Sequence, residues 1–370
     1  MKATRRLHEL GQSLWLDNIT RGLLSRGTLG RYIRDLSVTG LTSNPTIFDH
    51  AVGQTAFYDE AIRRKAAEGL GGEALFFDLA IEDLTRAADL FRPVHDATGG
   101  ADGWVSLEVS PLLAYDAQST LAAARGLQAR AARPNLFIKI PGTEQGLPAV
   151  EDAIAAGVPI NITLLFSRDQ YQAAADAYLR GVEKRLAAGL DPRVRSVASL
   201  FVSRWDRAVA KKVPAALRNR LGIAVAQQTY KAYRDLLASP RWRRLEAAGA
   251  WPQRLLWAST GTKDPAAPDT LYVEALAAPD TINTMPEATL LAVAEHGTVG
   301  DVLPRGGGDA EAVLERFRRA GVDLAALAAE LQRDGAAAFA ASWTDLLASM
   351  SSKAASLGAR TEAGHSAARG

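Results

Sequence analysis

The sequence predicts an α/β fold, a (β/α)8 TIM barrel with additional helices that include a C-terminal helical region. Short apolar runs alternate along the 370 residues with longer stretches that have helical periodicity. Continuous apolar strands that alternate with helices indicate parallel βαβ units whose sheet is covered on both faces. Because eight such units need about 250 residues, the chain has room for one barrel and for extra helices.

Each of the eight expected strands is a short run of mostly apolar residues. In chain order the strands cover residues 12–17, 36–42, 104–110, 135–140, 159–165, 197–202, 255–260 and 280–285. The stretches between them, such as STLAAARGLQARAA and LPAVEDAIAAG, repeat their apolar residues at the spacing of an amphipathic helix. In the last unit, LYVEAL at 271–276 is interpreted as a short helix, with a strand as the alternative.

The residues in excess of a minimal barrel fall in three segments. They are the helical stretch 45–103, the segment 204–253, and the region after about 305, where DLAALAAELQRDGAAAFAASWTDLLASM has helical periodicity. Residues 353–370 are small and polar, which is typical of a flexible tail. We therefore expect one domain over 1–352, followed by this tail.

Composition and charge exclude several kinds of site. Hydrophobic residues make up 48% of the chain and charged residues 23%, as in soluble globular proteins, and the net charge of +2 requires neither nucleic acid nor membrane as a partner. The absence of cysteine excludes disulfides, zinc–thiolate sites, iron–sulfur clusters and a thiol nucleophile. The N-terminal residues lack the apolar core of a signal peptide, and no apolar run is long enough to span a membrane. We therefore expect a cytoplasmic protein.

Sequence motifs for metal or nucleotide chemistry are missing. The five histidines show no HExxH-like spacing, so no metal site is expected. The run ASTGTKD lacks the GxxxxGK spacing of a P-loop, and no GxGxxG follows the first strand.

Polar residues recur near the C-terminal ends of the expected strands, on a single parity within each strand. Successive side chains of a strand point to opposite faces, so one parity of a barrel strand points inward. Barrel enzymes keep their catalytic groups at this end of the strands. A ring of polar residues from six or seven strands therefore predicts an active site, made of Asp17, Thr42, Asn44, Ser106, Glu108, Ser110, Lys139, Asn161, Thr163, Ser199 and Ser259.

Lys139 interrupts the apolar run NLFIKI and is central to this prediction. Lysine is rarely buried unless it is paired or used in chemistry, so Lys139 is either the counter-charge of an ion pair or an amine nucleophile. Desolvation at an apolar strand end favours the neutral amine, whereas a nearby Glu108 anion favours the ammonium. The nucleophile interpretation thus predicts that Glu108 is protonated for part of the reaction cycle, or is separated from Lys139 by water.

Structural interpretations stand beside the functional ones. Asn44 followed by Pro45 is a good helix N-cap with proline at the first helical position. Asp17 and Glu108, each taken alone, are compatible with satisfied carboxylates of a protein core.

Five motifs, in this order, resemble the signatures of the transaldolase family. They are VTGLTSNPTIF, SLEVSP, LFIKIPGTEQG, NITLLFS and WASTGTKDP, and the resemblance is to the longer bacterial subfamily over about residues 10–350. It implies a class I, Schiff-base aldolase barrel that needs neither metal nor cofactor. Such enzymes serve the pentose phosphate pathway. They transfer a dihydroxyacetone unit from sedoheptulose 7-phosphate to glyceraldehyde 3-phosphate, giving erythrose 4-phosphate and fructose 6-phosphate. Sugar phosphates are therefore the expected partners, and we expect a monomer or a homodimer.

The resemblance also implies a role for each residue that matches the family's motifs. Lys139 becomes the Schiff-base lysine, and Asp17 the acid/base that takes the proton of the C4 hydroxyl. Glu108, with a water held by Thr163, moves protons while the carbinolamine loses water. The hydroxyls of the three-carbon unit are expected to bind Asn44, Thr42, Asn161 and Ser199.

Phosphate binding is implied for Arg204, in LFVSRWD, and for Ser259, because a guanidinium fork and a hydroxyl suit phosphate oxygens. The run STGTKD replaces the family's serine–aromatic–arginine run, so Lys263 is the expected substitute cation, at an offset that differs by two residues. The structural alternative for Arg204 is a surface ion pair with Asp206.

Two other functions are alternatives to transaldolase. A fructose 6-phosphate aldolase is a lyase with the same barrel and lysine, but it uses a tyrosine in the site, whereas this chain presents Glu108 and Asp17. A non-catalytic sugar-phosphate-binding barrel is the other alternative, although such a protein has no need of a desolvated lysine.

Overall fold

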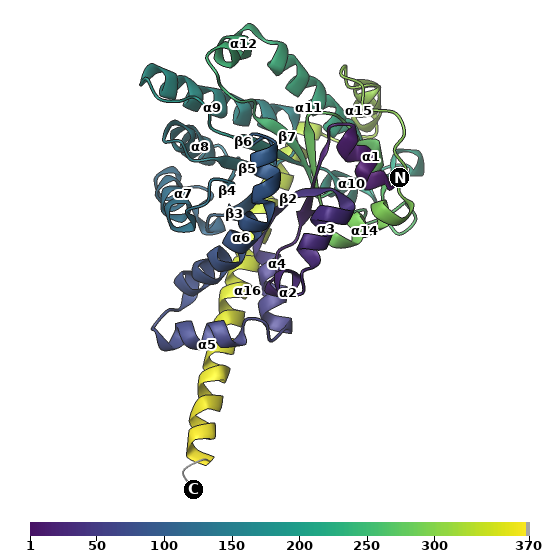
Figure 1. Cartoon of the computed structure of the whole chain (residues 1–370). Helices are drawn as coiled ribbons and strands as arrows, with labels where there is room; N and C mark the ends of the chain where they lie inside the picture. The colour runs from purple at the N-terminus through teal and green to yellow at the C-terminus, as the bar shows by residue number, and fades with distance from the viewer. Residues whose placement is uncertain (368–370) are drawn as a thin grey trace.

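Eight parallel strands close into a barrel, which confirms the predicted fold class (Figure 1). The computed structural model describes residues 1–367, and the side chains as far as residue 358. Each strand pairs with the next, and the last pairs with the first. The strands are β1 (Ser13–Asp17), β2 (Val38–Thr42), β3 (Trp104–Glu108), β4 (Leu136–Pro141), β5 (Ile160–Leu165), β6 (Ser196–Phe201), β7 (Arg254–Ala258) and β8 (Thr281–Met285).

Helices surround the barrel, as the alternation of strand and helix patterns predicts. Those that precede β1 or follow a strand along the outside are α1 (Ala3–Glu9), α2 (Arg21–Ser25), α3 (Thr28–Leu36), α6 (Gly72–Ala97), α7 (Ala117–Ala131), α8 (Gly146–Ala155), α9 (Arg168–Ala187), α11 (Leu221–Ala238) and α14 (Glu287–His296).

The additional helices occupy the three segments that the sequence analysis assigns to excess length. They are α4 (Pro45–Gln54), α5 (Asp59–Ala67), α10 (Ser203–Val209), α12 (Pro240–Ala247), α15 (Ala310–Arg319) and α16 (Leu324–Ala367). The run at 271–276 forms the short helix α13 (Leu271–Ala275), which confirms the helical interpretation. Two 3₁₀ turns, η1 (Pro111–Leu113) and η2 (Ala215–Leu217), complete the elements of the described residues.

Three strands end earlier than their apolar runs predict. They are β3, β6 and β7, whose expected runs were 104–110, 197–202 and 255–260. Strand β2 ends where its run 36–42 ends but begins two residues later. After β3 the chain turns into η1 at Pro111, and after β7 Ser259 adopts the left-handed conformation with φ 56°. Val109 and Ser110 after β3 and Thr260 after β7 are still buried although the strands have ended, so burial patterns inferred from sequence do not mark the ends of these strands.

The tail expected at 353–370 coincides with the end of α16 up to Ala367. Its last three residues, 368–370, lie outside the described residues. The flexibility of this tail and the domain boundary at 352 stay predictions.

An apolar layer fills the barrel interior toward the N-terminal ends of the strands. The rings of Trp104 and Phe137 stack with centroids 4.1 Å apart, and Trp15 lies 6.2 Å from Phe137. Gly40 on β2 leaves room for these rings, because a Cβ there would lie 2.6 Å from Trp15 Nε1. The layer comprises Trp15, Trp104, Phe137, Val197, Leu256 and Ile282.

Polar side chains follow this layer toward the C-terminal ends of the strands. Two residues beyond each member of the apolar layer, the same strand face presents the next inward side chain. Most of these second side chains are polar: Asp17, Ser106, Lys139, Ser199, Ala258 and Thr284. The alternation along the strands therefore places the predicted site above a closed apolar floor.

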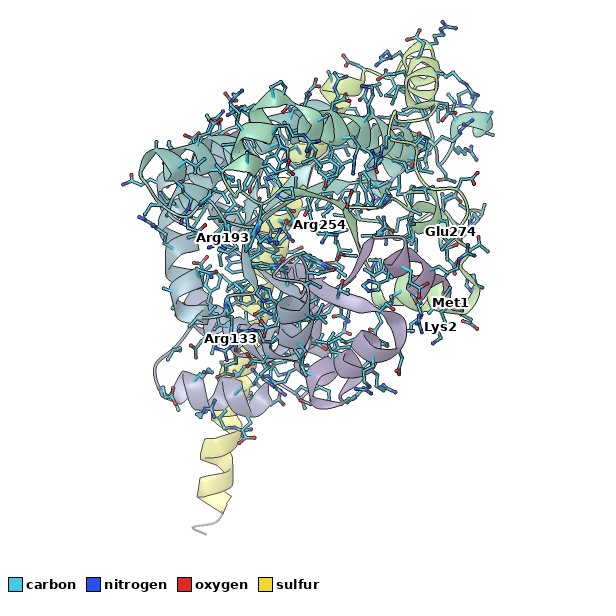
Figure 2. The ribbon with its side chains drawn as sticks, turned by 45° about the horizontal axis from the view of Figure 1, so that its top comes forward. Met1, Lys2, Arg133, Arg193, Arg254 and Glu274 are labelled. Carbon is cyan, nitrogen blue, oxygen red and sulfur yellow. The ribbon has the colours of Figure 1, made fainter. Side chains whose placement is uncertain are left out.

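A polar cluster closes the opposite, N-terminal end of the barrel. Arg254, labelled in Figure 2, donates through Nη2 to Ser13 Oγ at 2.8 Å and to Thr281 O at 2.9 Å. Asp102 accepts a hydrogen bond of 2.8 Å from Trp15 Nε1 and another from the Ser13 hydroxyl. These contacts satisfy the polar groups at this end, so the open end of the barrel is the C-terminal one.

The long helix α16 runs past α4 and α5 and projects beyond the barrel (Figure 1). Gln332 Nε2 donates to Gly142 O at 3.0 Å and to Leu164 O at 2.9 Å, which fixes the helix to the loop after β4 and to β5. Trp343 Nε1 donates to Glu73 Oε1 at 2.8 Å, and Lys353 Nζ donates to Val52 O at 2.6 Å. Helix α16 therefore spans from the C-terminal ends of the strands to the helices inserted after β2. No helix among the described residues is both long and apolar enough to cross a membrane.

Candidate active site

Lys139 lies on β4 with only 6% of its side chain exposed. Its Nζ donates a hydrogen bond of 3.0 Å to Ser43 O and lies 3.5 Å from Glu108 Oε2. Glu108 is the register partner of Lys139 on the neighbouring strand β3, so the ladder itself brings the amine and the carboxyl together. The structure thus places Lys139 and Glu108 side by side, as the sequence analysis considers.

Glu108 is buried with few partners. Neither of its carboxyl oxygens accepts a hydrogen bond from another described residue within normal distance, and the Lys139 ammonium at 3.5 Å is its nearby cation. Burial raises the pKa of Glu108 above its ordinary value, the positive charge of Lys139 opposes this rise, and the charge of Asp17 adds to it. A carboxyl with a raised pKa holds its proton more readily, which is the direction that an amine nucleophile at Lys139 requires.

Asp17 ends β1 and is held by hydrogen bonds that Glu108 lacks. Thr42 Oγ1 donates to Asp17 Oδ1 at 2.7 Å and lies 2.7 Å from Thr284 Oγ1, so Thr284 donates to Thr42. Burial raises the pKa of Asp17, and the charge of Lys139 together with hydrogen bonds from Thr42 and Asn44 opposes the rise. Asp17 therefore has fixed donors for its ionised form.

Asn44 combines the structural and the functional interpretation. Its Oδ1 accepts a hydrogen bond of 3.2 Å from Ile47 N and caps α4, with Pro45 at the first helical position. Its side chain also hydrogen-bonds Asp17, which leaves the amide nitrogen as the donor. The helix cap thus fixes the direction of the amide at the edge of the site.

The side chains of β5 and β6 continue the polar network. Ser199 Oγ donates to Asn161 Oδ1 at 2.7 Å, and Asn161 Nδ2 donates to Ser106 Oγ at 3.2 Å. Thr163 is buried, and its hydroxyl has no hydrogen-bond partner among the described residues. A buried hydroxyl without a protein partner at a cavity wall is suited to hold a water or a ligand.

A cavity of about 360 Å³ opens among these side chains. Of the thirteen site residues that the sequence predicts, nine line it. The other four are Ser106, Glu108, Ser110 and Asn161. Glu108 and Asn161 lie behind the wall and contact the lining residues Lys139 and Ser199. The predicted residues that line the cavity are Asp17, Thr42, Asn44, Lys139, Thr163, Ser199, Arg204, Ser259 and Lys263.

Sequence reasoning missed nine residues of the cavity wall: Thr46, Ile47, His50, Phe201, Ala258, Gly261, Thr284, Pro286 and Phe339. Thr284 and Phe201 follow the inward parity of β8 and β6, so the rule that found Asp17 and Ser199 would have found them too. His50 and Phe339 come from α4 and α16, and no strand parity marks a helical residue as part of a barrel site.

Arg204 lies at the start of α10, lines the cavity and forms no ion pair with any described residue. The structural alternative, a bridge to Asp206, is wrong, because Asp206 instead accepts from Leu221 N at 2.8 Å, from Gly222 N at 3.1 Å and from the Tyr272 hydroxyl at 2.9 Å. Burial, together with the charge of Arg207, lowers the pKa of Arg204 below its ordinary value. This guanidinium is partly desolvated and lacks a counter-charge, as expected of a site that receives an anion.

Ser259 and Lys263 lie on the same side of the cavity. Ser259 Oγ is 2.9 Å from Ser203 Oγ, and the left-handed backbone at Ser259 directs the chain away from the strand toward the cavity wall. Asp264, which follows Lys263, accepts a hydrogen bond of 2.7 Å from Asn219 Nδ2, so it is engaged away from the neighbouring ammonium.

The model of the protein family described as Transaldolase/Fructose-6-phosphate aldolase matches residues 14–350. The chain belongs to this family. Curated relatives named Transaldolase include one from Parafrankia sp. (strain EAN1pec), which is 47% identical over 351 residues that cover 92% of this chain and 95% of the relative. A second, from Acidothermus cellulolyticus, is 46% identical over 93% of this chain and 95% of the relative. A third, from Thermobifida fusca, is 46% identical over 93% and 96%. These matches confirm the resemblance to the transaldolase family that the five motifs indicate.

The geometry of this transaldolase/fructose-6-phosphate aldolase family member suits carbonyl chemistry. An amine at a cavity wall can add to a ketone, and burial raises the pKa of both carboxyls, which is the direction that a proton donor requires. Within the described residues, no three histidine, aspartate or glutamate side chains gather closely enough to hold a metal ion. The cavity thus brings together an amine, carboxyls and cationic side chains, which are the group types that Schiff-base chemistry on a phosphorylated sugar needs.

Proposed function

We propose that the protein is a transaldolase that transfers a dihydroxyacetone unit from sedoheptulose 7-phosphate to glyceraldehyde 3-phosphate through a Schiff base at Lys139. One observation carries this proposal. A lysine with 6% of its side chain exposed faces a polar cavity and lies 3.5 Å from a buried carboxyl that has a raised pKa. The products are erythrose 4-phosphate and fructose 6-phosphate, as in the pentose phosphate pathway.

The first half of the reaction joins the donor to the enzyme. The neutral amine of Lys139 attacks the C2 carbonyl of the ketose, a C–N bond forms, and the carbonyl oxygen takes a proton. Glu108 supplies and removes protons through a water at the Thr163 hydroxyl, and the carbinolamine loses water to give an iminium. The raised pKa of Glu108 supports this role, because a proton donor must be protonated near the pH at which it acts.

The cleavage step uses the other carboxyl. Asp17 takes the proton of the C4 hydroxyl, the C3–C4 bond breaks, and its electron pair moves to the iminium, which becomes a neutral enamine. The aldose phosphate leaves, and the enamine adds to the next aldehyde by the reverse steps. Hydrogen bonds from Asn44, Thr42, Asn161 and Ser199 hold the hydroxyls of the three-carbon unit, and Arg204, Ser259 and Lys263 bind the phosphate.

Transfer is favoured over the lyase alternative by the composition of the cavity wall. A fructose 6-phosphate aldolase of this barrel type is expected to use a tyrosine in the site. Among the described residues that line the cavity there is no tyrosine, and the aromatic side chains there are Phe201 and Phe339. Release of free dihydroxyacetone from fructose 6-phosphate without an acceptor aldehyde would favour the lyase.

Trapping the Schiff base tests the proposal directly. With fructose 6-phosphate and borohydride, the wild-type protein should gain the mass of a reduced three-carbon adduct on Lys139, whereas Lys139→Met should gain none and should lose about 10⁴-fold or more in kcat. Lys65→Met is the matched control, because Lys65 is also buried but is paired with Asp78 and Glu82 away from the cavity. An adduct in Lys139→Met, or none in the wild type, would contradict the proposal.

A further inference from the structure

We propose that Gly335 and Phe339 of α16 are positioning residues that hold the guanidinium of Arg204 in place for the substrate phosphate. This inference rests on the proposed function, in which Arg204 binds that phosphate. It assigns to the C-terminal helix, far from the catalytic strands in sequence, a part in recognising phosphorylated substrates.

Two aromatic rings face the Arg204 guanidinium. Its central carbon lies 5.0 Å from the ring centroid of Phe201 and 5.8 Å from that of Phe339. Arg204 has no ion pair and no side-chain hydrogen bond with any described residue, so all its donors are free for a ligand. Contact with ring faces orients a guanidinium without consuming its N–H groups, which suits a cation that has to meet a phosphate.

Gly335 allows α16 to approach this guanidinium closely. A Cβ at residue 335 would lie 3.2 Å from Arg204 Nη1 and 3.0 Å from Leu164 Cδ2. Glycine in the middle of a helix costs about 1 kcal/mol relative to alanine, so a mid-helix glycine with such neighbours is explained by the close approach it permits. The absence of a side chain at residue 335 therefore leaves room for the Arg204 guanidinium beside the helix.

The segment of α16 that contacts Arg204 is fixed on both sides. Gln332 donates to Leu164 O and Gly142 O, at the point where the left-handed Leu164, with φ 59°, interrupts the β5 ladder. On the other side Ser342 Oγ accepts a hydrogen bond of 3.0 Å from Thr46 Oγ1. Residues 332, 335 and 339 share one helix face, because they are three and four positions apart. The anchored helix thus fixes the position of the Phe339 ring and of the space beside Gly335.

Acceptor kinetics test the inference. Sedoheptulose 7-phosphate is kept saturating as the donor, and kcat/KM, followed as release of erythrose 4-phosphate, is measured for glyceraldehyde 3-phosphate and for unphosphorylated glyceraldehyde. Gly335→Ala and Phe339→Leu should each lower kcat/KM for the phosphorylated acceptor about tenfold, the size expected when one charge-assisted hydrogen bond is impaired. The value for glyceraldehyde should stay within about twofold. Gly358→Ala is the matched control on the same helix, because a Cβ there meets no atom within 4 Å, and it should leave both values unchanged.

A double-variant cycle separates positioning from a general effect on the helix. In an Arg204→Ala background, adding Gly335→Ala should cause no further loss with glyceraldehyde 3-phosphate, because the group it displaces is gone. Equal losses for the two acceptors, a further loss in the Arg204→Ala background, or a tenfold loss in Gly358→Ala would overturn the inference. If the wild-type protein forms no borohydride adduct, the proposed function itself is wrong. If the adduct forms but the variants lose kcat/KM equally for both acceptors, only this inference is wrong.

Discussion

Asp17 and Glu108 share one cause of a raised pKa, burial, but differ in how their ionised forms are supported. Thr42 and Asn44 donate to Asp17, whereas Glu108 has only the ammonium at 3.5 Å. Donors to a carboxylate favour its ionised form, so Asp17 is more readily available than Glu108 in the form that accepts a proton. The two environments thus suit the two proposed roles, in which Asp17 accepts the C4 proton and Glu108 is the proton source for the loss of water.

The pH dependence of donor cleavage should report the raised pKa of Asp17. As a base Asp17 must be ionised, and its folded-state pKa lies above the ordinary value of 3.8, so activity should fall as pH drops through a midpoint above 3.8. The acid limb of kcat/KM for fructose 6-phosphate measures this midpoint. Asp17→Asn should lower kcat by about 10²–10⁴-fold. A midpoint of the acid limb at or below pH 3.8 would contradict the assignment of Asp17 as the base.

Strand parity predicted most of the site because a barrel converts alternation in sequence into a ring in space. Lys139 and Asp17 were identified in this way, and Thr284 would have been by the same rule. Phe339 could not be found, since its place depends on how α16 crosses the strand ends, and a helical period says which face is buried but not against what. The structural alternative for Arg204, a bridge to Asp206, is wrong because Asp206 instead accepts hydrogen bonds from the backbone at the start of α11.

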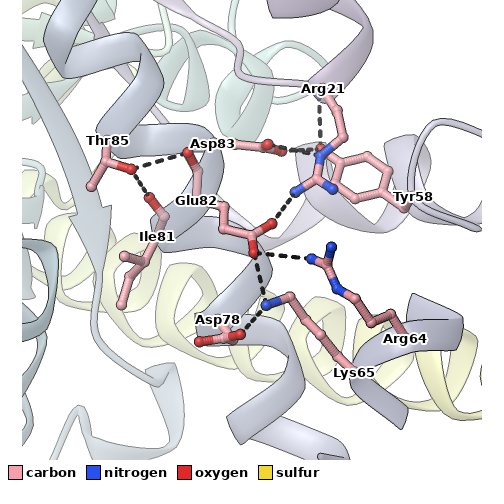
Figure 3. Close-up of polar contacts among 9 residues, drawn as sticks. All are labelled: Arg21, Tyr58, Arg64, Lys65, Asp78, Ile81, Glu82, Asp83 and Thr85. Atoms are coloured by element: carbon pink, nitrogen blue, oxygen red, sulfur yellow. Dashed lines mark hydrogen bonds and ion pairs between the residues drawn. The ribbon is translucent and has the colours of Figure 1, made fainter. Parts of the chain in front are cut away.

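At the scale of elements, an ion-pair network joins α2, α5 and α6 (Figure 3). Arg21 Nε donates to Asp83 at 2.9 Å, and the Tyr58 hydroxyl donates to the other oxygen of Asp83 at 2.8 Å. Asp83 is fully buried, and Arg21 has 13% of its side chain exposed. The network therefore fixes the inserted helices to the barrel wall through a charge that water does not reach.

Removing the buried member of this network should cost more stability than removing an exposed one. Asp83→Leu leaves Arg21 without its buried partner and should lower the free energy of unfolding by about 3 kcal/mol. Glu82→Gln is the matched control, because Glu82 also pairs with Arg21 at 2.9 Å but is 37% exposed, and it should cost about 1 kcal/mol or less. Denaturant unfolding measures both. Equal losses in the free energy of unfolding would show that burial does not set the contribution of the Arg21–Asp83 pair.

The sequence predicted where strands and helices lie more reliably than where they end. Every expected strand overlaps an observed one, because apolar runs bounded by helical patterns leave few other pairings in a parallel barrel. The ends at β3 and β7 were overextended, since Val109 and Thr260 beyond them are buried like strand residues, and the left-handed turn after β7 falls on Ser259 and not on a glycine. Local backbone conformation decided those ends, and composition does not encode it.

Across the whole molecule, α16 connects the phosphate side of the cavity to the helices inserted after β2. Its N-terminal half carries Gln332 and Phe339 at the strand ends, and Trp343 follows one turn later. The Trp343 ring lies 4.7 Å from that of Phe76 and 5.5 Å from that of Phe77, both on α6. A single helix thus contacts the cavity wall and the helices that follow β2, so we expect stability and the proposed phosphate recognition to be coupled through it.

Trp343→Ala should reveal this coupling. The side chain is 1% exposed, and its loss removes the contacts with Phe76 and Phe77 and the hydrogen bond to Glu73, which should destabilise the protein by about 3–5 kcal/mol. Thr344→Ala, the exposed neighbour on the same helix, should leave the Tm within a degree or two. Because the same helix holds Phe339 against Arg204, Trp343→Ala should also lower kcat/KM for glyceraldehyde 3-phosphate more than for glyceraldehyde. Thermal unfolding and the two-acceptor assay check both effects. A lowered Tm with equal losses for the two acceptors would mean that α16 stabilises the fold without transmitting anything to the phosphate site.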